Sequence, residues 1–91
     1  MLHVHFSSAF LPQIGAQDIE ITEGISTLRD LFAYLSIHFP AWAEEVGLEG
    51  DTPDYNLLTA INGQLASSLQ GLDTPFHDGD CVEFHLLLTG G

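Results

Sequence analysis

The 91-residue sequence contains no lysine, and its single basic residue, Arg29, stands against 13 acidic residues. The formal net charge is −12 with neutral histidines. Such a charge repels phosphate backbones and anionic headgroups, which argues against nucleic acids and membranes as partners. It favours the approach of a basic protein, although solubility alone would also account for it. The absence of lysine excludes a lysine nucleophile and any modification of a lysine side chain in this chain.

The sequence has one cysteine, Cys81, so an internal disulfide is excluded. A reducing compartment is compatible with this usage. The apolar runs are shorter than a membrane-spanning helix requires, and no charged-then-apolar leader opens the chain. The hydrophobic content of 45% argues against disorder, and 91 residues suit one domain. Together these features predict a soluble, cytoplasmic, single-domain protein.

The first third of the sequence has the patterns of two strands and a helix. Residues 2–6 and 18–22 alternate apolar and polar side chains, which predicts a hairpin of half-buried strands joined through a turn region at 7–17. A helix is predicted from a cap at Ser26 or Thr27 to a stop at Pro40. Its apolar face consists of Leu28, Leu31, Phe32, Leu35 and Phe39. One further helical turn is expected at 41–46, with Trp42 packed over the helix end.

The rest of the sequence predicts three more strands. An exposed loop is expected at 47–55, followed by a hairpin around Asn62-Gly63 and a turn-rich connection to residue 80. The last strand begins at Cys81 and alternates, so that Val82, Phe84 and Leu86 share one face. Because one helix covers only one face of such a sheet, the fold class is α+β. We expect a roll with a mixed sheet of four to five strands and one open face.

The residues from 60 to 91, AINGQLASSLQGLDTPFHDGDCVEFHLLLTGG, carry a resemblance to a known family. The strand before Asn62-Gly63, the Asp78-Gly79-Asp80 turn, the following apolar strand and the final Gly90-Gly91 resemble the MoaD/ThiS sulfur carriers. The resemblance implies a ubiquitin-like β-grasp domain over residues 1–91, with 87–91 as a flexible C-terminal tail. Three leucines before the diglycine and a long loop at 47–55 depart from the family pattern and bear on the choice of partner.

The resemblance also implies the chemistry of the tail. A ubiquitin-activating-type adenylyltransferase would use ATP to adenylate the carboxylate of Gly91, and sulfur would then replace AMP to give a thiocarboxylate. Gly90 suits a narrow channel, since glycine lets backbones approach closely. The acceptor would be a large synthase subunit or another sulfur-accepting enzyme. The protein would then be a carrier and not a catalyst, with no cofactor of its own.

The β-grasp arrangement places the first and last strands side by side. The side chains expected on the open face, beside Glu20, are His3, His5, Cys81, Glu83 and His85. These types can ligate a transition metal, but alternation alone would place them there, so we predict a partner surface and no metal site. Cys81 lies early in a strand and is predicted to be structural. The partner-binding residues expected overall are His3, His5, Glu83, His85, Leu87, Leu88 and Thr89.

Three functions are compatible with this sequence. A sulfur carrier is the leading one, and molybdopterin synthesis is preferred over thiazole synthesis because the LLLTGG ending looks more like the molybdopterin subunit. A ubiquitin-like modifier joined through Gly91 to a target lysine would start from the same acyl-adenylate. A plain interaction domain would have an incidental diglycine. No Ser/His/Asp order or phosphate-binding glycine loop indicates an enzyme.

Overall fold

A computed structural model describes residues 1–48, 52–53 and 56–86 of the chain. Five strands form one mixed sheet in the order β2-β1-β5-β3-β4. β1 (Leu2–Phe6) and β5 (Cys81–Leu86) are parallel neighbours at its centre, while β2 (Asp18–Ile21) pairs antiparallel with β1. This arrangement confirms the predicted β-grasp roll and the adjacency of the first and last strands.

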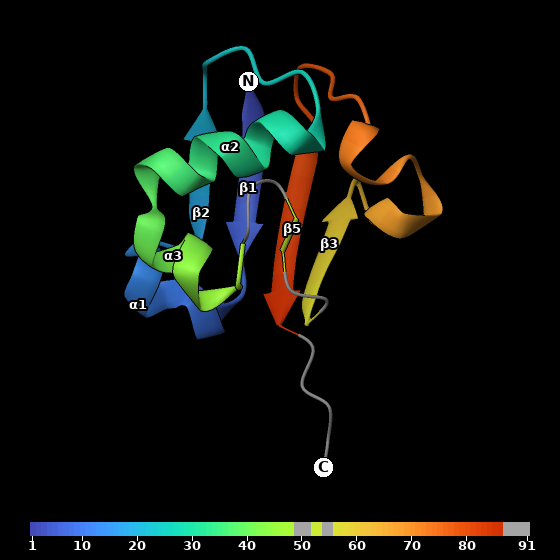
Figure 1. The fold of residues 1–91 in the computed structure, drawn as a ribbon. Helices are drawn as coiled ribbons and strands as arrows, with labels where there is room; N and C mark the ends of the chain where they lie inside the picture. The colour runs from blue at the N-terminus through green and yellow to red at the C-terminus, as the bar shows by residue number, and fades with distance from the viewer. Residues whose placement is uncertain (49–51, 54–55, 87–91) are drawn as a thin grey trace.

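The main helix, α2 (Leu28–His38), lies across one face of the sheet (Figure 1). Thr27 is its cap, because its side-chain oxygen accepts a hydrogen bond from the backbone N–H of Asp30 at 3.3 Å. The predicted apolar face is buried at Leu28, Leu31, Phe32 and Leu35, and Phe39 packs half-buried against the core. α2 ends before Pro40, as predicted, and Pro40 opens a short helix, α3 (Pro40–Glu45), which confirms the further helical turn expected at 41–46.

The segment between β1 and β2 is more ordered than the predicted turn. It contains a 3-10 turn, η1 (Ser8–Phe10), and a short helix, α1 (Leu11–Ile14), which Gly15 ends with a φ of 84°. Phe10 is 1% exposed and belongs to the core. Proline at the second position of α1 fits a helix start, since its missing N–H has no intrahelical acceptor there. The prediction of a plain turn was therefore wrong for this segment.

An aromatic cluster fills the space between the sheet and the helices. Trp42 of α3 is 0% exposed, and its ring centroid lies 5.1 Å from that of Phe84 and 5.5 Å from that of Phe6. Phe10 and Phe32 complete the cluster around it. Trp42 is therefore at the centre of the core and does not simply cover the end of α2. Its burial leaves no indole surface for a ligand.

The second half of the chain forms the hairpin that the sequence predicts. β3 (Leu57–Ile61) and β4 (Gln64–Leu65) are joined by Asn62-Gly63, whose φ angles of 51° and 83° are those of a type I′ turn. β3 pairs antiparallel with β5, and two 3-10 turns, η2 (Ala66–Ser68) and η3 (Gly71–Asp73), follow β4. Among the described residues, no helix has the length and apolar character to cross a membrane.

Candidate functional site

The candidate site has two parts, the tail and the open face of the sheet, and the structure describes only the second. Leu87, Leu88, Thr89, Gly90 and Gly91 lie outside the described residues, and so does the predicted boundary of the tail at 87. Leu86, the last described residue, is predicted to face the core but is 38% exposed. It lies opposite Leu57 of β3 at the end of β5. The tail thus follows directly from a central strand held by neighbours on both sides.

The open face carries the polar side chains predicted for it. The register pairs His3 with Cys81 and His5 with Glu83 across β1 and β5, and His85 follows on β5. The rings of His5 and His85 lie 6.2 Å apart, centroid to centroid. All three histidines are half-buried, and Cys81 is exposed. The structure therefore brings together the four described residues of the predicted partner surface, namely His3, His5, Glu83 and His85.

Each histidine of this face has a carboxylate partner. His5 Nδ1 lies 2.8 Å from Asp18 Oδ1, and His3 Nδ1 lies 3.4 Å from Glu20 Oε1. His85 Nε2 lies 3.6 Å from Glu83 Oε1. Asp18 was not among the predicted site residues, although the hairpin register of β1 and β2 places it opposite His5. These imidazole–carboxylate pairs give the face polar groups that suit contacts with a protein surface.

The geometry of these groups does not form a metal site. Within residues 1–48, 52–53 and 56–86, no three His, Cys, Asp or Glu side chains are arranged to hold a metal ion. The carboxylate of each pair instead lies close to a single imidazole. The Sγ atom of Cys81 is 4.0 Å from the carbonyl oxygen of Gly79, at the start of β5. A helix N-terminus that points at a thiol commonly makes the thiol nucleophilic, and a thiol at the start of a strand lacks that influence.

The Asp-Gly-Asp turn and the Asn-Gly turn form one structural unit. Asn62 donates from Nδ2 to Asp80 Oδ1 at 3.0 Å and accepts from the backbone N–H of Cys81 at 3.0 Å. The backbone N–H of His77 donates to Asp80 Oδ2 at 2.8 Å. The hydrogen bond from Asn62, followed by that from His77, lowers the pKa of Asp80 below its ordinary value. These motif residues therefore fix the start of β5, the strand that leads to the tail.

The N-terminus is attached to the same turn. The N-terminal ammonium of Met1 pairs with Asp78, and the Met1 carbonyl accepts from the N–H of Gly79. The N–H of His3 donates to the carbonyl of Asp80. The Asp78-Gly79-Asp80 motif is thus the junction of the two central strands.

Comparison with known proteins connects this fold to one family. The model of the ThiS family matches residues 11–91. None of the curated protein sequences compared with the chain matches it significantly.

Solved structures share the whole fold at low sequence identity. A chain of the Amycolatopsis orientalis BexX/CysO complex has a TM-score of 0.83 at 14% identity, with 100% of both chains covered. The small archaeal modifier protein 1 (SAMP1) of Methanosarcina acetivorans has a TM-score of 0.81 at 20% identity, covering 99% of this chain and 95% of that one. A putative molybdopterin converting factor subunit 1 of Pyrococcus furiosus has a TM-score of 0.74 at 23% identity, covering 96% and 97%. The family match over residues 11–91 and the shared β-grasp fold show that this chain belongs to the ThiS family of MoaD/ThiS-like sulfur carriers.

Proposed function

We propose that this protein carries sulfur as a thiocarboxylate on Gly91 for the biosynthesis of a sulfur-containing cofactor. The observation that carries the proposal is the ThiS family match through residue 91, which includes Gly90-Gly91. The fold supports it, because β5 leads directly from the sheet centre to these residues. Molybdopterin is the preferred product, and a relative described as a molybdopterin converting factor subunit shares the fold.

The proposed chemistry takes place in two steps at one carbon atom. The Gly91 carboxylate attacks the α-phosphorus of ATP on a ubiquitin-activating-type enzyme, so that pyrophosphate leaves and a mixed anhydride forms. A sulfide-level sulfur nucleophile then attacks the carbonyl carbon. AMP leaves with one former carboxylate oxygen, and a C–S bond replaces that C–O bond. Activation is required because a free carboxylate is a poor electrophile. In this scheme the protein supplies the substrate atom, and ATP is bound by the partner.

The open face of the sheet is the proposed docking surface for the activating enzyme or the sulfur acceptor. His3, His5, Glu83 and His85 lie together on the central strands and are half-buried, and each histidine is paired with a carboxylate. Leu87, Leu88 and Thr89 would extend the contact into the channel of the partner. The absence of a possible internal disulfide suits a cytoplasmic setting.

Intact-mass spectrometry tests the proposal directly. The protein is incubated with ATP, a sulfide source and the activating enzyme of its host, which is shown to be active on another carrier. We expect a mass increase equal to the exchange of one oxygen for sulfur, and no increase for a variant lacking Gly91. An unchanged mass with the active enzyme would refute the carrier function. In the same assay, His3→Gln with His5→Gln should raise the KM for the carrier if the open face docks the enzyme.

The second candidate is a protein modifier joined through Gly91 to lysine side chains of other proteins. It is favoured by the shared fold of a protein described as a small archaeal modifier. Since this chain has no lysine, a second copy cannot attach to a lysine side chain of the first. Recovery of Gly91 in a branched peptide from host extract would establish this function.

A further inference from the structure

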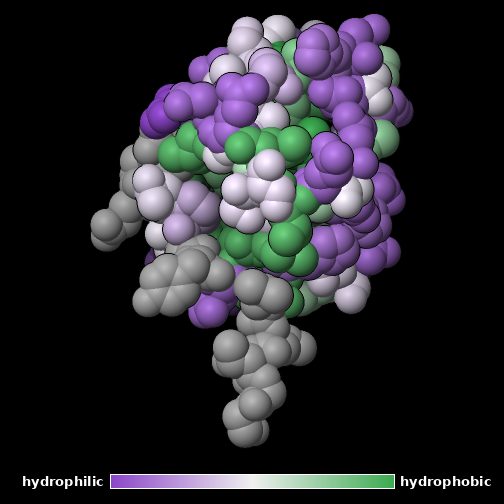
Figure 2. Space-filling model, turned by 90° about the vertical axis from the view of Figure 1, so that its right-hand side faces the viewer, coloured by the Kyte–Doolittle hydropathy of each residue, from purple (hydrophilic) through white to green (hydrophobic). Residues whose placement is uncertain are grey.

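An apolar groove lies beside β3, at the edge of the sheet far from β2. Its volume is about 390 Å³, and its lining comes from α2, Pro53, β3, β4, η2 and η3. Figure 2 shows hydrophobic surface on this side of the molecule, surrounded by hydrophilic side chains. The sequence did not indicate this groove, and the open-face histidines do not line it.

The groove follows an incomplete sheet edge. β4 pairs with β3 only at Ala60 and Ile61, because it ends at Leu65 and the chain turns away into η2. The stretch of β3 from Leu57 to Thr59 therefore has β5 on one side and, within the described part of the chain, no strand on the other. Unpaired strand edges are templates for the addition of another strand.

The register identifies the backbone groups at this edge. The N–H of Asn62, just after β3, donates to the carbonyl of Cys81 on β5. Since backbone direction alternates along an antiparallel strand, the groups of Ala60 and Leu58 also face β5. The N–H groups of Leu57 and Thr59 and the C=O of Leu57 must then face outward, whereas the pairing of Ala60 with Leu65 places the C=O of Thr59 opposite the N–H of Ala66. Two donors and one acceptor are therefore aligned along the groove.

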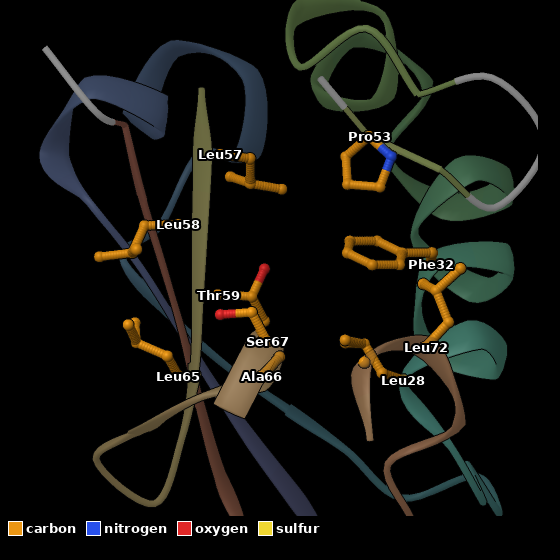
Figure 3. A pocket seen from close by; sticks show the side chains of 11 residues that line it. Leu28, Phe32, Pro53, Leu57, Leu58, Thr59, Leu65, Ala66, Ser67 and Leu72 are labelled. Atoms are coloured by element: carbon orange, nitrogen blue, oxygen red, sulfur yellow. The ribbon is translucent and has the colours of Figure 1, made fainter. Parts of the chain in front are cut away.

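The side chains around the edge suit a strand with apolar residues. Figure 3 shows Leu57 and Thr59 on the side of β3 that faces α2, across from Phe32 and Leu72. Leu58 and Leu65 lie on the opposite side of the same strand. The lining thus continues around both faces of the edge. A strand added here would place alternate side chains against these two apolar surfaces.

The net charge of the chain indicates which kind of partner the groove favours. A second copy would bring another net charge of −12 to the edge, which opposes close approach. Arg29, the one basic residue of the sequence, follows Leu28 of the lining and lies 3.2 Å from the Asp73 carboxylate. The charge of the chain therefore favours a partner with basic flanks.

We propose that the groove beside Leu57–Thr59 binds an extended segment of a partner protein, apolar in its middle and basic at its ends, by strand addition to β3. Main-chain hydrogen bonds to Leu57 and Thr59 would provide affinity, and the apolar pockets on the two faces of the edge would provide specificity. Strand addition to β3 does not require the chemistry proposed for Gly91, so either proposal can fail without the other.

The probe is a synthetic peptide with lysine at both ends and valine alternating with threonine between them. Amide hydrogen exchange of the full-length protein is followed by NMR as the peptide is added. The amides of Leu57 and Thr59 should become protected, whereas those of Leu58 and Ala60 already face β5 and should not change. A peptide N-methylated at every second residue, on the side facing β3, should not bind, because it lacks the donors for the edge.

Two leucines of similar exposure provide matched variants. Leu65, 41% exposed, lines the groove, and Leu69, 38% exposed, does not. Leu65→Ser should weaken peptide binding by about fivefold or more through lost apolar contact, whereas Leu69→Ser should leave it unchanged. Equal effects of the two substitutions would overturn the proposal.

Four further results would also overturn the proposal. The first is that no peptide binds at millimolar concentration, and the second is that added peptide protects only the amides of the open-face strands. The other two are seen without peptide. Protection of Leu57 and Thr59 that grows with protein concentration without peptide would show a second copy at the edge. Protection without peptide that disappears in a variant ending at Leu86 would show that the chain's own tail fills the groove.

Discussion

At the scale of single residues, the Asn-Gly and Asp-Gly-Asp turns have structural roles that their residue types explain. Asn62 adopts a positive φ of 51°, which asparagine tolerates better than most residues. Its amide then bridges Asp80 and the backbone of Cys81. Asp80 accepts from both Asn62 and His77 and is therefore the acceptor on which the start of β5 depends.

Asp80→Asn should destabilise the protein near neutral pH. The carboxylate accepts two hydrogen bonds, and an amide retains only one acceptor oxygen, so we expect a loss of about 1–2 kcal/mol in the free energy of unfolding. The pKa of Asp80 is lowered in the folded protein, so this stability is present above the unfolded pKa of about 4. It is lost as the pH falls through the lower folded pKa.

Urea denaturation of both proteins across this range provides the measurement. The difference in the free energy of unfolding between wild type and Asp80→Asn should shrink as the pH falls below about 4. Glu44→Gln removes a carboxylate from the exposed surface of α3 and serves as the matched control, with no expected change. A difference that persists unchanged in acid would argue against the carboxylate as its source.

At the scale of elements, periodicity predicts much of the fold, while contacts distant in sequence determine the remainder. Alternation correctly indicates β1 and β2, and the helical apolar spacing correctly indicates α2. Phe10 could not be assigned to the core from a segment with proline and glycine, because its burial depends on packing against Trp42 of α3. The groove could not be predicted from the sequence either, since it arises where β4 stops pairing with β3.

The N-terminus of α2 gives a prediction at this scale, because the sequence left Ser26 and Thr27 as alternative caps. Thr27 accepts from the N–H of Asp30, and its loss leaves that donor without its side-chain acceptor. Thr27→Ala should therefore lower the free energy of unfolding by about 1 kcal/mol, and Thr27→Ser should retain most of the stability.

Ser26→Ala is the control for the cap, since Ser26 is exposed and its backbone carbonyl, not its hydroxyl, accepts from Phe76. Its midpoint of thermal unfolding should stay within the spread of wild-type measurements. A larger loss at Ser26 than at Thr27 would show that the cap is assigned to the wrong residue.

At the scale of the whole molecule, the apolar core and the net charge have opposite effects on stability. The core holds the sheet and helices together through apolar contacts that carry no charge. Among the described residues no acidic or basic side chain is buried, and like charges outside the core repel one another in the compact state. The same charge that would select a basic partner therefore lowers the stability of the free protein.

Salt should consequently stabilise this protein near neutral pH. About 0.5 M sodium chloride shortens the screening length to a few ångströms and weakens the repulsion among exposed carboxylates. We expect the midpoint of thermal unfolding to rise by about 5 °C relative to low salt, equivalent to about 1 kcal/mol for a domain of this size. Near the isoelectric point of 4.2 the net charge vanishes, so the same salt step should produce little or no rise. Equal increases in the midpoint at the two pH values would instead indicate a general effect of salt on apolar burial. The net charge would then not be what lowers the stability of this fold.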